Sequence, residues 1–152
     1  MQLQPGDTGQ DGTMRWNDLE VARKILSSYR SWAVVGCSDD PARPSFGVAT
    51  FLQDQGYSVV CINPNHDSCI EGAPCYPDLA SVNEPIEVVD IFRRSEFVEP
   101  HVEEAIAVGA KAVWMQLGVI NERAARRAAD AGLDVVMDRC PRIDFRRELM
   151  PS

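Results

Sequence analysis

The sequence contains no apolar run that approaches the roughly 20 residues required to cross a bilayer. Residues 1–13 are polar and glycine-rich, with no Lys or Arg, which argues against a secretory signal and favours a disordered tail. The 152-residue chain has room for one domain of ordinary size, which we expect over residues 14–152. We therefore expect one cytoplasmic domain with no membrane partner.

Basic residues are also scarce. The chain has 15 Lys and Arg against 23 Asp and Glu, a net charge of -8, and no basic run longer than the pair Arg146-Arg147. A surface with this charge repels a polyanionic duplex, so nucleic acid is not expected as a partner. An anionic ligand must instead be held by a few local donors.

No catalytic constellation is present in the sequence. The two histidines, His66 and His101, do not lie in a motif with a nucleophile, and His101 is expected to be a solvated surface residue. The adjacent carboxylates Asp39-Asp40 and Glu103-Glu104 are typical of solvated faces. We therefore expect a binding protein in preference to an enzyme.

The cysteines are odd in number, and with no signal peptide we expect reduced thiols. The five cysteines are Cys37, Cys61, Cys69, Cys75 and Cys140. Cys61, His66, Cys69 and Cys75 offer four zinc-ligand types within fifteen positions, but their spacing is wider than the paired C-x2-C of structural zinc sites. On that ground we predict no metal site.

Apolar runs of strand length alternate with segments of helical spacing along the chain. We expect strands at 32–36, 57–62, 73–76, 87–92, 111–115 and 133–137, of which 73–76 is a short edge strand. We expect helices that begin at caps Asn17, Ser45 and Asn121, and a further helix from Val98 to Gly109. Residues 139–152 show no clear period.

This alternation predicts an α/β fold, a doubly wound and mainly parallel Rossmann-like sheet with helices on both faces. In such sheets, ligands bind outside the carboxyl ends of the strands, where the strand order reverses. The functional residues should therefore follow the strands.

The loop after the first expected strand offers several anion donors without a G-x-G-x-x-G motif. Gly36 allows close backbone approach, Ser38 offers a hydroxyl, and Arg43 is a bidentate phosphate donor. The helix expected to begin at the Ser45 cap, directly after Pro44, can face a phosphate with its N-terminus. A plain strand-to-helix turn is the alternative interpretation, and Cys37 is expected to be a turn residue.

The second strand ends at Asn63-Pro64, where NAD-binding domains usually carry an acidic residue for the ribose. The absence of a carboxylate argues against NAD and leaves room for a phosphorylated ribose. The alternative is a simple turn.

Two further strand ends supply candidate ligand-binding residues. Arg93 follows the fourth strand and points to an anion in the crevice, while Phe92 beside it either stacks on a base or packs in the core. Gln116 and Gly118 follow the fifth strand and place an amide and a flexible glycine at the same rim.

Taken together, these strand ends resemble the small stand-alone CoA-binding-domain proteins of bacteria and archaea, whose nucleotide fold also occurs in the succinyl-CoA synthetase alpha subunit. The resemblance spans about 19–147. The matching stretches are 34–38, 41–45, 56–59, 62–64, 72–77, 89–93, 109–111, 114–118 and 136–140.

The resemblance implies binding of coenzyme A through its 3′-phospho-ADP part. In the family, the turn after the first strand cradles the phosphates, which corresponds to residues 36–38 and the Arg43 loop. Asn63 and Pro64 would border the adenosine end, and Phe92 and Arg93 would close over the ligand.

The chain departs from this family at two points. No counterpart of the synthetase subunit's second domain, which holds the phosphorylated histidine, is expected within these 152 residues, so the resemblance does not imply ligase activity. Cys37 stands where the family often has a smaller residue. The strand ends and the absence of catalytic residues favour a non-catalytic sensor, carrier or accessory protein. An acyl-CoA enzyme is one expected protein partner, and a homodimer packed through the alanine-rich segment 124–129 is the other. The alternatives are an NAD(P)-binding or other nucleotide-binding module or oxidoreductase, and an interaction protein with a vestigial crevice.

Overall fold

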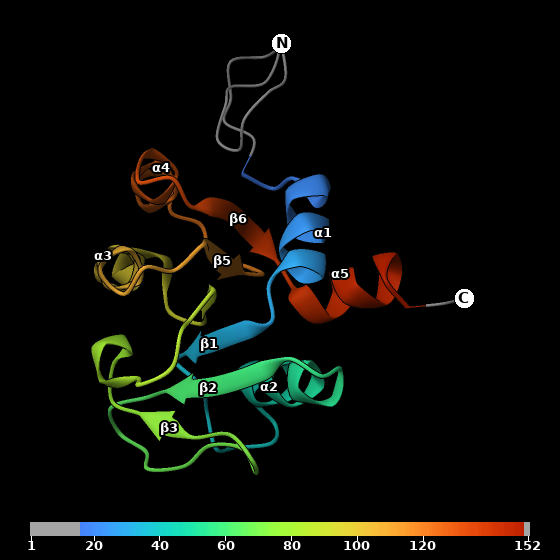
Figure 1. Cartoon of the computed structure of the whole chain (residues 1–152), viewed down its shortest axis with the longest axis vertical. Helices are drawn as coiled ribbons and strands as arrows, with labels where there is room; N and C mark the ends of the chain where they lie inside the picture. Colours follow the sequence, from blue (N-terminus) through green and yellow to red (C-terminus); the bar gives the residue numbers. More distant parts are fainter. Residues whose placement is uncertain (1–15, 151–152) are drawn as a thin grey trace.

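The computed structural model describes residues 16–150, which form a six-stranded sheet in which every strand pair is parallel (Figure 1). The strand order is β3-β2-β1-β4-β5-β6. The strands are β1 (Ser31–Val35), β2 (Ser58–Ile62), β3 (Cys75–Tyr76), β4 (Val88–Ile91), β5 (Ala112–Gln116) and β6 (Asp134–Arg139). The predicted doubly wound fold is confirmed, and each strand lies within two residues of its predicted bounds.

Helices cover both faces of this sheet. Side chains of α3 and α4 pack with one buried cluster, and those of α1, α2 and α5 pack with the other (Figure 1). Because successive strand side chains point to opposite faces, neighbouring residues such as Val34 and Val35 contribute to different clusters. The helices are α1 (Leu19–Ser28), α2 (Pro44–Asp54), α3 (Val98–Ala107), α4 (Glu122–Asp130) and α5 (Pro141–Glu148), with short 3-10 turns at Leu79–Ser81 and Ser95–Phe97.

Two predicted helix caps are wrong, and one is confirmed. Asp18, not Asn17, caps α1, and its carboxylate accepts from the Glu20 amide. The side-chain amide of Asn17 instead donates to the carbonyl of Asp138 in β6, so it is not directed at the helix amides. Asn121 caps α4 as predicted, with its side chain accepting from the Ala124 amide.

Ser45 does not cap α2 either. The helix begins at Pro44, which the fixed φ of proline favours at the first position, and its cap residue Arg43 makes no side-chain capping bond. The Ser45 hydroxyl accepts instead from the Ser38 amide, 3.0 Å away. The first amides of α2 are therefore left without a side-chain cap.

The segment after β6, which shows no period in the sequence, forms the helix α5. Its buried residues include Asp144, whose two carboxylate oxygens accept from the Arg139 guanidinium at 2.7 and 2.9 Å. The helix is held by an ion pair as well as by apolar contact, so hydrophobic spacing alone does not reveal it. In space, α5 lies beside α1 and α2 (Figure 1).

The strand order reverses between β1 and β4, which both leave the sheet at the same edge. In an open parallel sheet this switch point opens a crevice outside the carboxyl ends of the strands. None of the helices between residues 16 and 150 is long and apolar enough to span a membrane. The tail predicted at 1–13 lies outside the described residues.

Candidate functional site

Two adjoining cavities lie at the carboxyl edge of the sheet. The larger has a volume of about 940 Å³ and the smaller about 320 Å³. Their linings have five residues in common: Gly36, Arg43, Asn63, Phe92 and Arg93. All five follow β1, β2 or β4, so the cavities meet at the predicted switch point.

Gly36 lines both cavities where the ends of β1 and β4 approach each other. Its φ of +82° lies in the left-handed region, and a Cβ atom there would lie 2.3 Å from the carbonyl oxygen of Phe92. Only glycine permits both features. The close approach brings the ends of β1 and β4 together under the two cavities.

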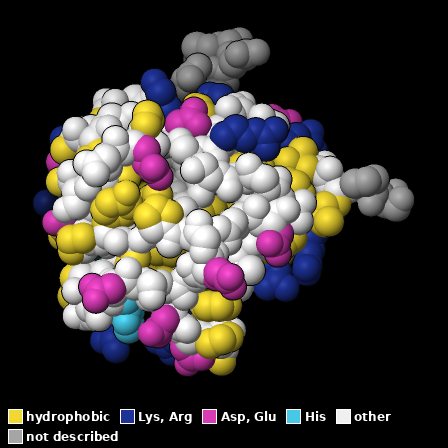
Figure 2. All heavy atoms as spheres, turned by 60° about the horizontal axis from the view of Figure 1, so that its bottom comes forward, with side chains coloured by type: hydrophobic (Ala, Val, Ile, Leu, Met, Phe, Trp, Pro, Cys, Tyr) yellow, Lys and Arg dark blue, Asp and Glu magenta, His cyan; other side chains and the backbone are white. Residues whose placement is uncertain are grey.

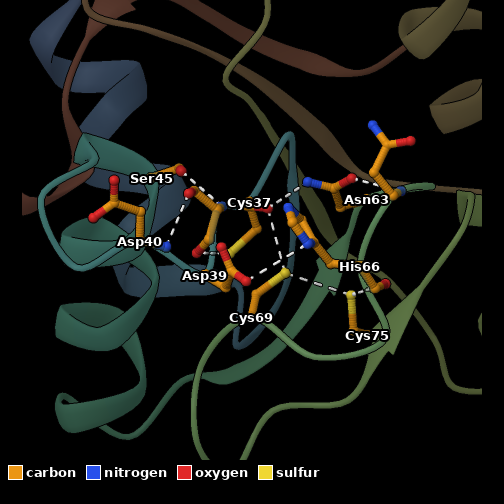
Figure 3. Close-up of polar contacts among 10 residues, drawn as sticks. Cys37, Asp39, Asp40, Ser45, Asn63, His66, Cys69 and Cys75 are labelled. Atoms are coloured by element: carbon orange, nitrogen blue, oxygen red, sulfur yellow. Dashed lines mark hydrogen bonds and ion pairs between the residues drawn. The ribbon is translucent and has the colours of Figure 1, made fainter.

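The turn after β1 is braced by its own polar groups. The Ser38 amide donates to the Ser45 hydroxyl, and the Ser38 hydroxyl accepts from the Asp40 amide at 3.0 Å (Figure 3). The Asp40 carboxylate in turn accepts from the Ala42 amide at 2.9 Å. These bonds hold the loop that carries Arg43 at the start of α2.

Asn63 joins the end of β2 to the turn after β1. Its side-chain NH2 donates to the Cys37 carbonyl at 2.8 Å, and its side-chain oxygen accepts from the Asn65 amide at 2.8 Å (Figure 3). One N–H and one oxygen lone pair of the amide are therefore engaged within the protein, which fixes Asn63 in the cavity wall and leaves a second N–H and a second lone pair for a ligand.

The larger cavity is strongly basic within an acidic protein. No Asp or Glu of the described residues lines it, and none of its arginines forms an ion pair with a described carboxylate. The face of the molecule shown in Figure 2 has scattered acidic side chains, with Lys and Arg mostly near its edge. The arginines that line the cavity are Arg43, Arg93, Arg94, Arg142 and Arg146.

Apolar side chains complete the wall of the same cavity. Val48 and Phe92 also pack against the core, whereas Leu117 and Ile143 are 58% and 46% exposed. An exposed apolar wall beside a set of free cations suits a ligand with an anionic part and a less polar part.

Ten of the twelve predicted site residues line the cavities. The larger cavity has Ser38, Pro44, Ser45 and Gln116 in addition to the five shared residues, and Pro64 lines the smaller one. Cys37 and Gly118 line neither. The Cys37 side chain is fully buried, and Gly118 donates from its amide to the Asp138 carboxylate at 2.7 Å.

His101 is not the solvated surface residue that the sequence predicted. Its side chain is 22% exposed, lines the smaller cavity, and places Nδ1 2.9 Å from the Glu104 carboxylate. Helix α3 faces the strand ends here, and that packing is not evident from the polar residues around His101.

Sequence reasoning missed the arginines contributed by α5. Arg142 and Arg146 stand over the ring of Phe51, at 5.9 and 5.2 Å from its centroid, and reach the larger cavity. The charged pair Arg146-Arg147 was visible in the sequence, but nothing there placed it opposite the turn after β1. The fold brings the two segments together through contacts between α2 and α5.

The cysteines near the site are buried thiols rather than exposed nucleophiles. A hydrogen bond with Cys61, together with burial, raises the pKa of Cys37, and burial raises the pKa of Cys69 to about 12. Thiols with raised pKa values are poor nucleophiles near neutral pH. The same hydrogen bond with Cys37 lowers the pKa of Cys61, whose side chain is fully buried.

Comparison with known proteins connects this site to a family. A family model described as CoA binding domain matches residues 30–146. The chain is 36% identical over 121 residues to the uncharacterized protein YneT of Bacillus subtilis (strain 168), a match that covers 80% of this chain and 89% of YneT.

Solved structures agree with that assignment. The chain is similar to a hypothetical protein from Pyrococcus horikoshii OT3, with 35% identity, a TM-score of 0.83 and 99% of each chain covered. It is also similar to the dinucleotide forming acetyl-coenzyme A synthetase 1 of Ca. Korarchaeum cryptofilum, solved in complex with phosphate and ADP. That match has 27% identity and a TM-score of 0.63, and covers 72% of this chain and 26% of the synthetase. Since the family model spans most of the sequence, the protein belongs to the CoA binding domain family.

Proposed function

We propose that this protein binds coenzyme A, or an acyl-CoA, through its 3′-phospho-ADP part in the two adjoining cavities. One observation carries the proposal: five arginines line the larger cavity of a protein whose net charge is -8. Guanidinium groups form charge-assisted, bidentate bonds with phosphates. Coenzyme A carries a pyrophosphate and a ribose 3′-phosphate that require several such donors.

The phosphates are assigned to the junction of the cavities. Arg43 and Arg93 line both cavities, and the uncapped start of α2 lies beside Arg43. Pro44 has no amide hydrogen, and the amides of Phe46 and Gly47 donate to the Arg43 carbonyl, so the first turn of α2 offers the Ser45 amide to an anion in addition to the guanidinium groups. The dipole of α2 favours the same charge.

The adenosine end is assigned to the smaller cavity and the pantetheine arm to the larger one. The smaller cavity is bordered by Asn63 and Pro64 after β2 and by Pro77 after β3. The apolar wall at Leu117 and Ile143 suits the less polar arm. Phe92 lines both cavities, where its ring can contact a base or the arm.

The proposed role is that of a non-catalytic sensor, carrier or accessory protein. It is supported by the burial of Cys37, Cys61 and Cys69, and by the imidazoles of His66 and His101, which contact carboxylates and form no hydrogen bond with a hydroxyl or thiol among the described residues. NAD is the weaker ligand candidate, because Asn63 stands after β2, where NAD-binding domains usually carry a carboxylate for the ribose hydroxyl.

Titration calorimetry with CoA, acetyl-CoA and NAD tests this proposal, preceded by native mass spectrometry of the purified protein for retained ligand. We expect CoA to bind more tightly than NAD. Arg43→Ala and Arg93→Ala should each weaken CoA binding more than about tenfold, as expected for loss of a charge-assisted bond.

Arg126→Ala is the matched control, because Arg126 is exposed on α4 and lines neither cavity. It should bind CoA like the wild type. Unchanged affinity in both the Arg43 and Arg93 variants would discard the proposed site. Binding of NAD in preference to CoA would discard the proposed ligand.

A further inference from the structure

Four of the five cysteines gather beneath the turn after β1. The sulfur atoms of Cys37, Cys61 and Cys69 lie within 4.8 Å of one another. The sulfur of Cys75 lies 3.5 Å from that of Cys69 (Figure 3). The sequence interpretation had paired Cys61, Cys69 and Cys75 with His66; the structure puts Cys37 in the cluster and turns the His66 ring toward Asp39, 3.6 Å away.

The fold brings these thiols together from separate segments. Cys61 and Cys75 are register partners on the parallel strands β2 and β3, so their side chains project to the same face of the sheet. Cys37 follows β1, the other neighbour of β2. Cys69 comes from the loop between β2 and β3, which folds over that face.

All four side chains of the cluster are cysteines, so it offers sulfur ligands and no carboxylate. Cys37 and Cys61 are completely buried, Cys69 is 7% exposed, and Cys75 is half-buried. The Cys69 thiol can donate to the Cys37 carbonyl and the Cys75 thiol to the His66 carbonyl, at 3.3 Å each, and the sulfurs of Cys69 and Cys75 also lie within hydrogen-bond distance of each other. Such weak bonds are readily given up when a thiolate gains a stronger partner.

We propose that Cys37, Cys61, Cys69 and Cys75 form a thiolate site for a thiophilic d10 metal ion, Zn²⁺ or Cu⁺. Soft sulfur ligands select these ions over Mg²⁺ or Ca²⁺, which prefer oxygen. Each thiol that binds releases its proton to solvent, and no electron is transferred. The inference is independent of coenzyme A binding.

The separations are close to those that a metal requires. With Zn–S bonds near 2.3 Å, a tetrahedral site places its sulfurs roughly 3.8 Å apart. The group of Cys37, Cys61 and Cys69, with separations up to 4.8 Å, needs adjustments of about 1 Å at most. The Cys75 sulfur lies 3.5 Å from that of Cys69 but more than 4.8 Å from at least one of the other two, so its side chain must turn inward to become a ligand. Three thiolates suit Cu⁺, whereas Zn²⁺ calls for Cys75 as a fourth ligand, and its half-buried position gives the ion a route into the site.

A bound ion would tie three segments together under the ligand cavities. The Cys37 carbonyl already accepts from Asn63, which lines both cavities. Coordination at Cys37 and Cys69 would therefore fix the turn after β1 against the loop that precedes β3. We expect the metal to raise the thermal stability of the protein, because it binds only the folded arrangement.

Competition titrations test the proposal on the full chain, reduced and free of oxygen, with Zn²⁺ and Cu⁺ each set against a chromophoric chelator. We expect one equivalent of at least one ion to bind. Cys61→Ala should weaken binding by more than about 100-fold, since altering the outer shell of a metal site alone costs 10- to 100-fold. Cys140→Ala, which removes a buried thiol outside the cluster, should bind like the wild type.

Cys75→Ala separates the two ions. Loss of Zn²⁺ binding in this variant supports a four-thiolate zinc site, and retained Cu⁺ binding supports a three-thiolate copper site. Failure of both ions to bind the wild type at one equivalent would overturn the proposal, as would wild-type affinity in a folded Cys61→Ala.

A second measurement needs no variant. Alkylation of the wild type in urea below its unfolding transition should be slowed by the metal at Cys37, Cys61 and Cys69 but not at Cys140. Equal alkylation of the cluster with and without metal would overturn the proposal even if the substituted chains do not fold.

Discussion

The backbone of Gly36 lies so close to Phe92 that a Cβ atom at residue 36 would stand 2.3 Å from the Phe92 carbonyl oxygen. This contact joins the ends of β1 and β4, the two strands between which the sheet order reverses. The candidate site is therefore built on a backbone-to-backbone approach, and the arginines are arranged around it.

Gly36→Ala should destabilise the protein by about 3 kcal/mol or more, because it adds a clash with backbone to a strained positive φ. Gly56→Ala is the matched control. It has a φ of +94° but no atom within 4 Å of the added Cβ, so it should cost only about 1 to 2 kcal/mol. Urea unfolding measures both. Equal losses would show that the approach to Phe92 relaxes at little cost.

The α5 arginines should contribute to ligand binding. Arg142→Ala and Arg146→Ala should each lower CoA affinity several-fold, and most strongly at low ionic strength, since salt screens these charges. Arg147→Ala provides the control from the same helix, because Arg147 is exposed and lines neither cavity. Calorimetry at two salt concentrations would contradict this role if all three variants bound alike.

Gln116 should affect binding more than stability. Its side-chain oxygen is buried at the larger cavity without a hydrogen-bond partner among the described residues. Gln116→Leu removes that unsatisfied group, so we expect unchanged or higher stability together with a CoA affinity about 2- to 10-fold lower, the contribution of one neutral hydrogen bond. Lower stability with unchanged affinity would assign Gln116 to the core instead.

Asp90 should make stability depend on pH. It is fully buried in β4, and neither carboxylate oxygen has a partner among the residues described. Burial raises its pKa well above the ordinary 3.8, so the folded protein retains a proton that the unfolded chain releases. The resulting stability is fully present below the unfolded pKa and is lost as the pH rises toward the folded value.

Asp90→Asn keeps a neutral side chain at every pH and should remove this dependence. Between pH 4 and the folded pKa, wild-type stability should fall relative to the variant by about 1.4 kcal/mol per pH unit. Urea unfolding over a pH series measures the difference. Parallel stability profiles for the two proteins would contradict a neutral Asp90 in the folded state.

The sheet could be predicted from the sequence because its strands are buried on both faces. Runs such as 57–62 are nearly continuous in apolar residues, and glycines close the preceding helices. The location of the candidate site could also be predicted, because the carboxyl ends of parallel strands meet at one edge of the sheet. Ten of twelve predicted residues therefore line the cavities.

What could not be predicted depends on contacts between distant segments. Helix α5 is held partly by an ion pair between Asp144 and Arg139, so hydrophobic spacing did not predict this helix. Without the helix, Arg142 and Arg146 could not be placed at the site. The thiol cluster was missed because Cys37 joins it across the sheet, 24 residues from Cys61 in the chain. Spacing along the chain reveals only local ligand sets.

The central claim is that the site reads the 3′-phospho-ADP part of coenzyme A. The most direct test is calorimetric titration of the wild type with CoA and with dephospho-CoA, which lacks only the 3′-phosphate. The account predicts that dephospho-CoA binds at least about tenfold more weakly, the contribution of one charge-assisted phosphate contact. Equal affinities would contradict it and indicate a general nucleotide site.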